Sequence, residues 1–260
     1  MTDHIIVTDD GFIRTIQFNR PEKKNAILHA MYAKITDAMR DADVNPSIRV
    51  IVFKGTPGSF TAGNDMMDFV KGQRPEAKPH ADSQPVRMFL KALPEIQTPM
   101  VAIVDGIAVG VGVTMLMHCD LVYCSPNASF MTPFTALGLV PEAASSLLMP
   151  AAIGHQQAAE LLLLSKPINA KDALRMGFVT RVFKASKLEK KAKKEIDALA
   201  ALPPSAVREA KRLMRRLPEP VADRMAVEGK AFSARLSSEE FTEAASAFMS
   251  RRKPDFSKFK

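Results

Sequence analysis

The chain has 260 residues, 47% of them hydrophobic, and carries a formal net charge of +8. This length and apolar content fit one large core, or one core with a small appendage, and exclude a disordered or collagen-like chain. Two tyrosines and no tryptophan leave few rings for stacking on bases, which disfavours a dedicated nucleic-acid reader despite the basic charge.

The termini and the apolar runs predict a cytoplasmic protein that does not enter a membrane. The first residues lack a basic region followed by an apolar run, so we expect no secretory signal. The longest apolar stretch, residues 101–117, is interrupted by Asp105 and by small residues, which favours a buried strand and helix over a membrane span. The last residues, 257–260, do not form a peroxisomal Ser-Lys-Leu address.

Strand signals come first along the chain. Residues 5–7 and 13–18 alternate in hydrophobicity around Asp9-Asp10-Gly11 and predict a β-hairpin. Residues 26–41 predict an amphipathic helix and residues 50–53 a buried strand. The proline-containing segment 69–97 predicts a mobile loop followed by a helix, in a place typical of binding elements.

Strands and helices then alternate to about residue 195, which predicts parallel strands covered by helices. The predicted strands are residues 101–104, 121–123, 129–131 and 179–183. The predicted helices are residues 111–118, 143–149, 156–164 and 170–176. Residues 188–248 are helical and charged. We therefore divide the chain into a core at 1–195 and a helical packing or oligomerisation region at 196–260.

Two loops that follow strands are rich in small residues, which can expose backbone N–H groups. They are residues 59–65 and 105–112, and Glu142 follows them in Val140-Pro141-Glu142. One carboxylate beside two amide donors suits proton transfer next to a carbonyl better than water addition, which needs a second acid or base. The alternative is a glutamate in the first turn of a helix that starts at Pro141, where it complements the helix dipole.

The order and spacing of several motifs resemble the crotonase superfamily, that of enoyl-CoA hydratases and isomerases, over nearly the whole chain. The motifs are Asn19-Arg20-Pro21-Glu22-Lys23-Lys24-Asn25-Ala26, Phe60-Thr61-Ala62-Gly63-Asn64-Asp65, Val104-Asp105-Gly106, Cys119-Asp120-Leu121-Val122-Tyr123, and Ala170-Lys171-Asp172-Ala173 with Gly177-Phe178-Val179. The resemblance implies an α/β fold, a crotonase-like (ClpP/crotonase) spiral of β-β-α units with a C-terminal helical region. It also implies acyl-CoA substrates and a homo-oligomer, either a trimer or a dimer of trimers.

The resemblance further implies an oxyanion hole made by the amides of Ala62 and Val111, each donor worth about 3 kcal/mol. The two glutamates of water-adding members fall at Thr114 and Phe134, and neither residue is a carboxylate. Glu142 falls at the catalytic carboxylate of the Δ3,Δ2-enoyl-CoA isomerase branch. The implied chemistry moves one proton from C2 to C4, with no metal or redox cofactor and with CoA present as part of the substrate.

The expected substrate-binding residues come from the same loops and from the tail. Surface solvation explains each lysine about as well as a contact with the CoA phosphates. The set is Lys23, Lys24, Ala26, Gly63, Asn64, Asp65, Gly110, Phe134, Lys253 and Lys258, with Ala26 presenting its backbone and Phe134 an apolar wall.

Several other interpretations stay open or are disfavoured. A hydratase-like or hydrolase-like enzyme, a dehalogenase, and a non-catalytic CoA- or RNA-binding protein are the alternatives. Gly110-Val111-Gly112 lacks the third glycine of a dinucleotide loop, and Ser145-Ser146 lacks a histidine partner for a hydrolase triad. His118 is expected as a packed core residue rather than a ligand, and the two cysteines as buried free thiols.

Overall fold

Two β-sheets and the helices around them form the core of the computed structural model, which describes residues 3–68, 84–215 and 221–259. The larger sheet has the order β1 (Ile5–Asp10), β2 (Ile13–Phe18), β3 (Val50–Lys54), β5 (Met100–Val104), β7 (Leu121–Cys124) and β10 (Arg181–Val182). β1 and β2 form the predicted antiparallel hairpin, and the remaining neighbours are parallel. Nearly every residue of β3 and β5 is buried, as expected of parallel strands covered on both faces.

Of the smaller sheet, only β8 was predicted as a strand, at residues 129–131. The order of this sheet is β4 (Ser59–Thr61), β6 (Ile107–Val109), β8 (Ser129–Met131) and β9 (Ile168–Asn169). β3, β5 and β7 are each followed closely by a strand of this second sheet, so the chain passes repeatedly from one sheet to the other. This repetition confirms the expected spiral of β-β-α units.

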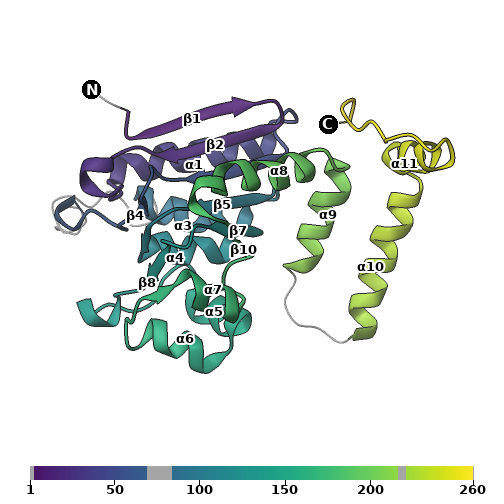
Figure 1. Cartoon of the computed structure of the whole chain (residues 1–260). Coiled ribbons are helices and arrows are strands. Elements are labelled where there is room, and N and C mark those ends of the chain that lie inside the picture. The colour runs from purple at the N-terminus through teal and green to yellow at the C-terminus, as the bar shows by residue number, and fades with distance from the viewer. Residues whose placement is uncertain (1–2, 69–83, 216–220, 260) are drawn as a thin grey trace.

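The helices lie close to their predicted positions (Figure 1). They are α1 (His29–Val44), α3 (Pro85–Glu95), α4 (Val111–Thr114) with the 3₁₀ helix η4 (Met115–His118), α5 (Ser145–Ile153), α6 (His155–Leu162), α7 (Ala170–Met176), α8 (Leu188–Ala200), α9 (Pro204–Met214), α10 (Val221–Leu236) and α11 (Glu239–Met249). The predicted helix at residues 26–41 begins only at His29, because Ile27 pairs with Asn64 as an isolated β-bridge and stays extended. In the segment 69–97, the predicted helix is α3, and residues 69–83 of the predicted loop before it lie outside the described residues.

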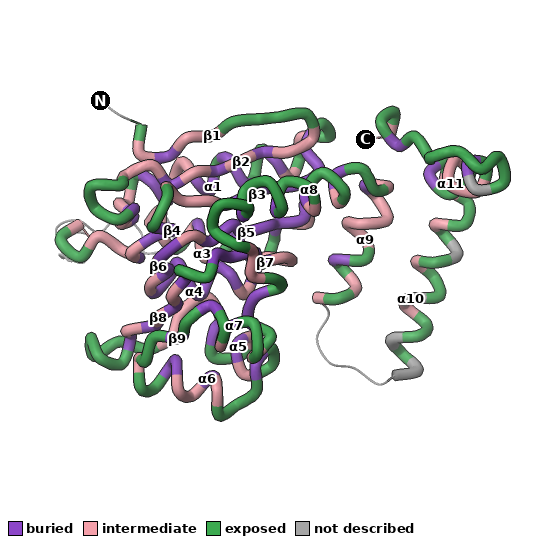
Figure 2. The backbone as a smooth tube through the Cα atoms, viewed as in Figure 1, coloured by how far each residue is buried: buried purple, intermediate pink, exposed green. Residues whose placement is uncertain are grey.

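Side chains alternate across the larger sheet and create two apolar layers. Ile51 and Phe53 of β3 face the main cluster with α1 and α3, whereas Val50 and Val52 face α8. Figure 2 shows the central strands as the most continuously buried part of the chain. The loops at the ends of these strands are therefore carried on a rigid base.

The C-terminal helices extend from the core on the side of α9 (Figure 1). The tail after α11 returns to the adjacent starts of β2 and β3, where Nη2 of Arg49, the residue before β3, donates to the carbonyls of Phe256 and Phe259 at 2.7 and 2.6 Å. The Arg49 guanidinium also stacks 3.7 Å from the centre of the Phe12 ring. α8 runs unbroken through residue 195, so the division into residues 1–195 and 196–260 stays a prediction.

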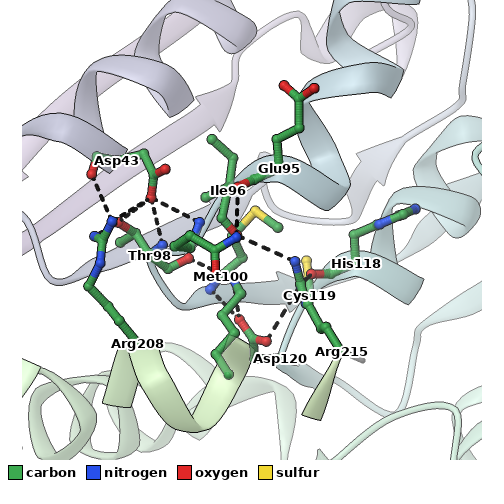
Figure 3. Close-up of polar contacts among 12 residues, drawn as sticks. Asp43, Glu95, Ile96, Thr98, Met100, His118, Cys119, Asp120, Arg208 and Arg215 are labelled. Carbon is green, nitrogen blue, oxygen red and sulfur yellow. Dashed lines mark hydrogen bonds and ion pairs between the residues drawn. The ribbon is translucent and has the colours of Figure 1, made fainter. Parts of the chain in front are cut away.

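α9 is fixed to the core by a buried ion pair. The Lys211 side chain is 2% exposed, and its Nζ lies 2.9 Å from Asp120 Oδ2 and 2.7 Å from the Thr98 carbonyl oxygen to which it donates. Figure 3 shows the surrounding network, in which Arg208 Nη1 donates to Thr98 Oγ1 at 2.7 Å. A charge this deeply buried depends on its partner.

We expect Asp120→Asn to lower the free energy of unfolding by about 3–5 kcal/mol, because it leaves the Lys211 ammonium buried without a counter-ion. Urea denaturation measures the change. The matched control is Asp197→Asn, which breaks an exposed pair with Lys193 at 2.8 Å and should cost less than about 1 kcal/mol. Equal losses in the two variants would contradict this assignment.

Candidate active site

Two loops meet at one edge of the smaller sheet because β4 and β6 are parallel neighbours. Their carboxyl ends therefore lie side by side, which brings residues 62–65 next to residues 110–112. Gly63 has φ +83°, and a Cβ there would lie 2.7 Å from the Val109 carbonyl oxygen. Glycine is required at this position because any side chain would push the two loops apart.

The second loop presents the backbone amide of Val111. Gly110 is the N-cap of α4, and its carbonyl accepts from the amides of Val113 and Thr114. The Gly110 amide donates to the Met131 carbonyl at 2.8 Å. The Val111 amide, at the first position of the helix, has no hydrogen-bond partner among the described residues, as is usual at a helix start.

In the first loop, the amide without a partner among the described residues is that of Asn64 rather than Ala62. The Ala62 amide donates to the Lys24 carbonyl at 2.9 Å, so the expectation that it faces a ligand oxygen is wrong for this structure. The Gly63 amide donates to Thr61 Oγ1 at 3.1 Å. Within the described ranges the Asn64 amide has no partner.

The bridge to Ile27 explains the direction of the Asn64 amide. The Ile27 amide donates to the Gly63 carbonyl at 2.8 Å, and the Asp65 amide donates to the Ile27 carbonyl at 2.9 Å. Backbone groups of successive residues in an extended segment point to opposite sides. The Asn64 N–H therefore points away from Ile27.

The carboxylate of Glu142 is held by the helix that Val111 begins. Its Oε1 accepts a hydrogen bond from Oγ1 of Thr114, the fully buried last residue of α4. Burial raises the pKa of Glu142, and the hydrogen bond from Thr114 acts in the opposite direction. The site therefore contains a carboxylate that binds protons more tightly than it would in water.

The alternative explanation of Glu142 as a first-turn helix carboxylate is wrong. α5 begins at Ser145, its N-cap is Ala144, and its first turn contains no acidic residue. Glu142 lies before the helix, in a tight turn, and is oriented by Thr114 rather than by the helix dipole.

The remaining residues of the first loop hold it in place. Arg20 Nη1 donates to the Ala26 carbonyl at 3.1 Å and to Asp65 Oδ2 at 2.8 Å, and this bond lowers the pKa of Asp65. Asp65 Oδ1 accepts from the amides of Met67 and Asp68. Asp65 thus braces its loop, and both of its carboxylate oxygens are engaged inside the protein rather than by a ligand.

The two pairs of lysines that were expected to contact the CoA phosphates lie far apart in the structure. Lys23 and Lys24 are exposed and follow the end of β2, whereas Lys253 and Lys258 lie on the tail, which docks at the start of β2 through Arg49. Six residues of strand span roughly 17 Å. The lysines of one chain therefore do not converge on a single phosphate group.

Phe134 lies just before the 3₁₀ helix η5 (Thr135–Leu137), and the residue is 8% exposed. Its backbone carbonyl accepts from the amides of Leu137 and Leu139 at 3.0 and 2.8 Å. No carboxylate stands at this position, so the site lacks the acid that a water-adding relative would place there.

Two residues that sequence reasoning did not assign also organise the site. Asn25 is fully buried, and its Nδ2 donates to the Ser59 carbonyl at 2.8 Å, which joins the Lys23–Lys24 loop to β4. Tyr32 donates to Oδ1 of Asn64, and its pKa is raised by burial and by the charge of Glu142. A buried tyrosine needs a partner for its hydroxyl, and that need is the signal available from the sequence.

No group of three or more His, Cys, Asp or Glu side chains suited to a metal ion occurs within residues 3–68, 84–215 and 221–259. Both cysteines are free, with Cys124 buried and Cys119 half-buried. Within the same ranges, every helix is too short or too polar to cross a membrane.

Comparisons with known proteins place this geometry in a family. Residues 9–259 match the family model described as enoyl-CoA hydratase/isomerase. Enoyl-CoA delta isomerase 2 of Rattus norvegicus is 39% identical over 82% of this chain, and that of Homo sapiens is 36% identical over 95%. The aligned part of this chain spans 54% and 64% of the lengths of those two relatives.

Among solved structures, a Magnetospirillum magneticum AMB-1 protein, named provisionally as an enoyl-CoA hydratase/carnithine racemase, is 37% identical and superposes with a TM-score of 0.93. The superposition covers 99% of this chain and 100% of that one. The match therefore extends to the C-terminal helices. The chain belongs to the enoyl-CoA hydratase/isomerase family, the crotonase superfamily that its motifs resemble.

Proposed function

We propose that this protein is a Δ3,Δ2-enoyl-CoA isomerase, which moves the double bond of a 3-enoyl-CoA into conjugation with the thioester. One observation carries the proposal: Glu142 is hydrogen-bonded to Thr114 on the same short helix that presents the unpaired Val111 amide. The rat and human relatives named enoyl-CoA delta isomerases support the same assignment.

The proposed reaction is a proton shuttle. Glu142 removes a proton from C2, and the electrons of that C–H bond form a dienolate whose charge rests on the thioester oxygen. The amides of Asn64 and Val111 donate to this oxygen, and each donor is worth about 3 kcal/mol. The same carboxyl group returns the proton at C4, which leaves the double bond between C2 and C3. No metal or redox cofactor enters these steps.

Water addition is the second candidate, because the family also contains hydratases and the Magnetospirillum relative carries a hydratase name. It requires a base to activate water and an acid to protonate C2, each worth about 10²–10⁴ in rate. Thr114 and Phe134 supply neither group. Dehalogenation needs a carboxylate nucleophile. In related dehalogenases that nucleophile is an aspartate, whereas this chain has Glu142 at the corresponding position, so dehalogenation is the weaker alternative.

The CoA moiety is proposed to bind along the first loop. Lys24 is the nearer of the two exposed lysines, since its carbonyl accepts from the Ala62 amide beside the oxyanion loop. Lys253 and Lys258 can contact the same CoA molecule as Lys23 and Lys24 only if they come from the tail of a second subunit. This arrangement fits a homo-oligomer such as a trimer or a dimer of trimers. Residues 196–260 are the proposed oligomerisation region, and the cytoplasm is the proposed location.

We expect Glu142→Gln to lower kcat for a 3-enoyl-CoA by about 10²–10⁴, because the amide cannot accept the C2 proton. Ultraviolet absorbance of the conjugated product measures turnover. The matched control is Glu189→Gln on the outer face of α8, which should leave kcat unchanged. Wild-type turnover in Glu142→Gln, or hydration of crotonyl-CoA by the wild type at the rate of isomerisation, argues against the proposal.

We expect Thr114→Val to move the acidic limb of the kcat/KM profile to higher pH. Thr114 donates to the ionised form of Glu142 and lowers its pKa, so loss of the hydroxyl raises that pKa further. The base then loses its charge at a higher pH as the solution is acidified. Thr8→Val, at an exposed position of β1, is the control. An acidic limb that stays in place or moves to lower pH contradicts this role of Thr114.

A further inference from the structure

His118 contacts the backbone of the segment that carries Glu142. It lies four residues after Thr114, at the end of the 3₁₀ helix η4 that continues α4. Thr114 donates to the Glu142 carboxylate, and His118 Nε2 lies 2.9 Å from the carbonyl oxygen of Ala143. The His118 residue is 6% exposed, so this hydrogen bond is shielded from water.

The turn after Glu142 has an unfavourable backbone. Ala143 and Ala144 have φ values of +54° and +55°, in the left-handed region that side-chain-bearing residues rarely adopt. The turn is closed by Ser145, whose amide and Oγ both donate to the Glu142 carbonyl, at 3.0 and 2.6 Å. A strained turn of this kind persists only where neighbouring groups hold it.

The environment of His118 keeps its ring neutral. Burial lowers its pKa, the charges of Arg215 and Lys211 on α9 act in the same direction, and the bond to Ala143 opposes them. Because a carbonyl only accepts, the neutral ring carries its hydrogen on Nε2. Arg215 also donates to the His118 backbone carbonyl, and in Figure 3 the ring points away from Asp120 and Arg215.

We propose that His118 is a positioning residue for the base. Its Nε2–H holds the strained Ala143–Ala144 turn in the conformation that presents Glu142 to the substrate beside the unpaired amides. This inference rests on the proposed isomerase function. Thr114 then fixes the carboxylate group, His118 fixes the backbone beneath it, and the Val111 amide belongs to the same helical segment.

The test compares His118→Leu, which has no donor, with His118→Gln, whose amide nitrogen reaches about as far as Nε2. We expect His118→Leu to lower kcat for a 3-enoyl-CoA about tenfold, the loss of one buried hydrogen bond, with KM nearly unchanged. His118→Gln should keep most of the wild-type kcat. His155→Leu, at an exposed position at the start of α6, is the matched control. Thermal unfolding of each variant reports whether it folds.

A second experiment tests whether His118 acts through the backbone conformation of residues 143 and 144. Glycine adopts the left-handed region without penalty, so Ala143→Gly with Ala144→Gly should restore part of the kcat lost in His118→Leu. The same glycine changes in the wild type give the kcat against which this recovery is measured. If His118→Leu does not fold, His118→Asn replaces it, because its shorter amide cannot reach the Ala143 carbonyl whereas that of His118→Gln can.

The outcomes separate the two proposals. A wild type without isomerase turnover overturns the proposed function and this inference with it. An active wild type with equal kcat in the donor-lacking and donor-retaining variants of His118 overturns the inference alone. Recovery of kcat by glycine at residues 143 and 144 supports it, since a role confined to packing predicts no such recovery.

Discussion

The parallel pairing of β4 with β6 is the constraint on which the site depends. It brings two backbone segments so close that Gly63 has no room for a Cβ, which would lie 2.7 Å from the Val109 carbonyl oxygen. These two segments present the amides of Asn64 and Val111, which have no partner among the described residues. The two N–H donors are held by the end of a strand and the start of a helix, so they are in place before a substrate binds. Such preorganised donors stabilise developing negative charge most strongly.

The short helix that begins at Val111 connects Glu142, the proposed base, with these two amides. Its first residue offers an amide, its fourth residue orients Glu142, and His118 at the end of the same helical segment contacts the next turn of backbone. Burial raises the pKa of Glu142 and makes it a better proton acceptor, while Thr114 limits that rise and fixes the rotamer. Arg215, at the end of α9, donates to the His118 carbonyl and so holds the end of this helical segment.

Much of the fold could be predicted from hydrophobic patterns. The β1–β2 hairpin, the buried strands β3 and β5 and the helix α7 lie where periodicity places them, because long apolar runs determine element type. The strands of the smaller sheet have only two or three residues, too few to show alternation. The start of α1 was predicted too early, because the pairing of Ile27 with Asn64 depends on a segment far along the chain.

In the candidate site, the side chains could be proposed from the sequence, but the directions of the backbone N–H groups could not. Glu142, Thr114 and Phe134 could be assigned by position, but choosing between the Ala62 and Asn64 amides needed the Ile27 bridge, since N–H groups alternate in direction along an extended segment. The backbone donors suit any reaction that places negative charge on a thioester oxygen. The reaction is therefore selected by the side chains at positions 114, 134 and 142. In the proposed function, the one carboxylate among these three both takes the proton and returns it, which suits a double-bond shift better than water addition.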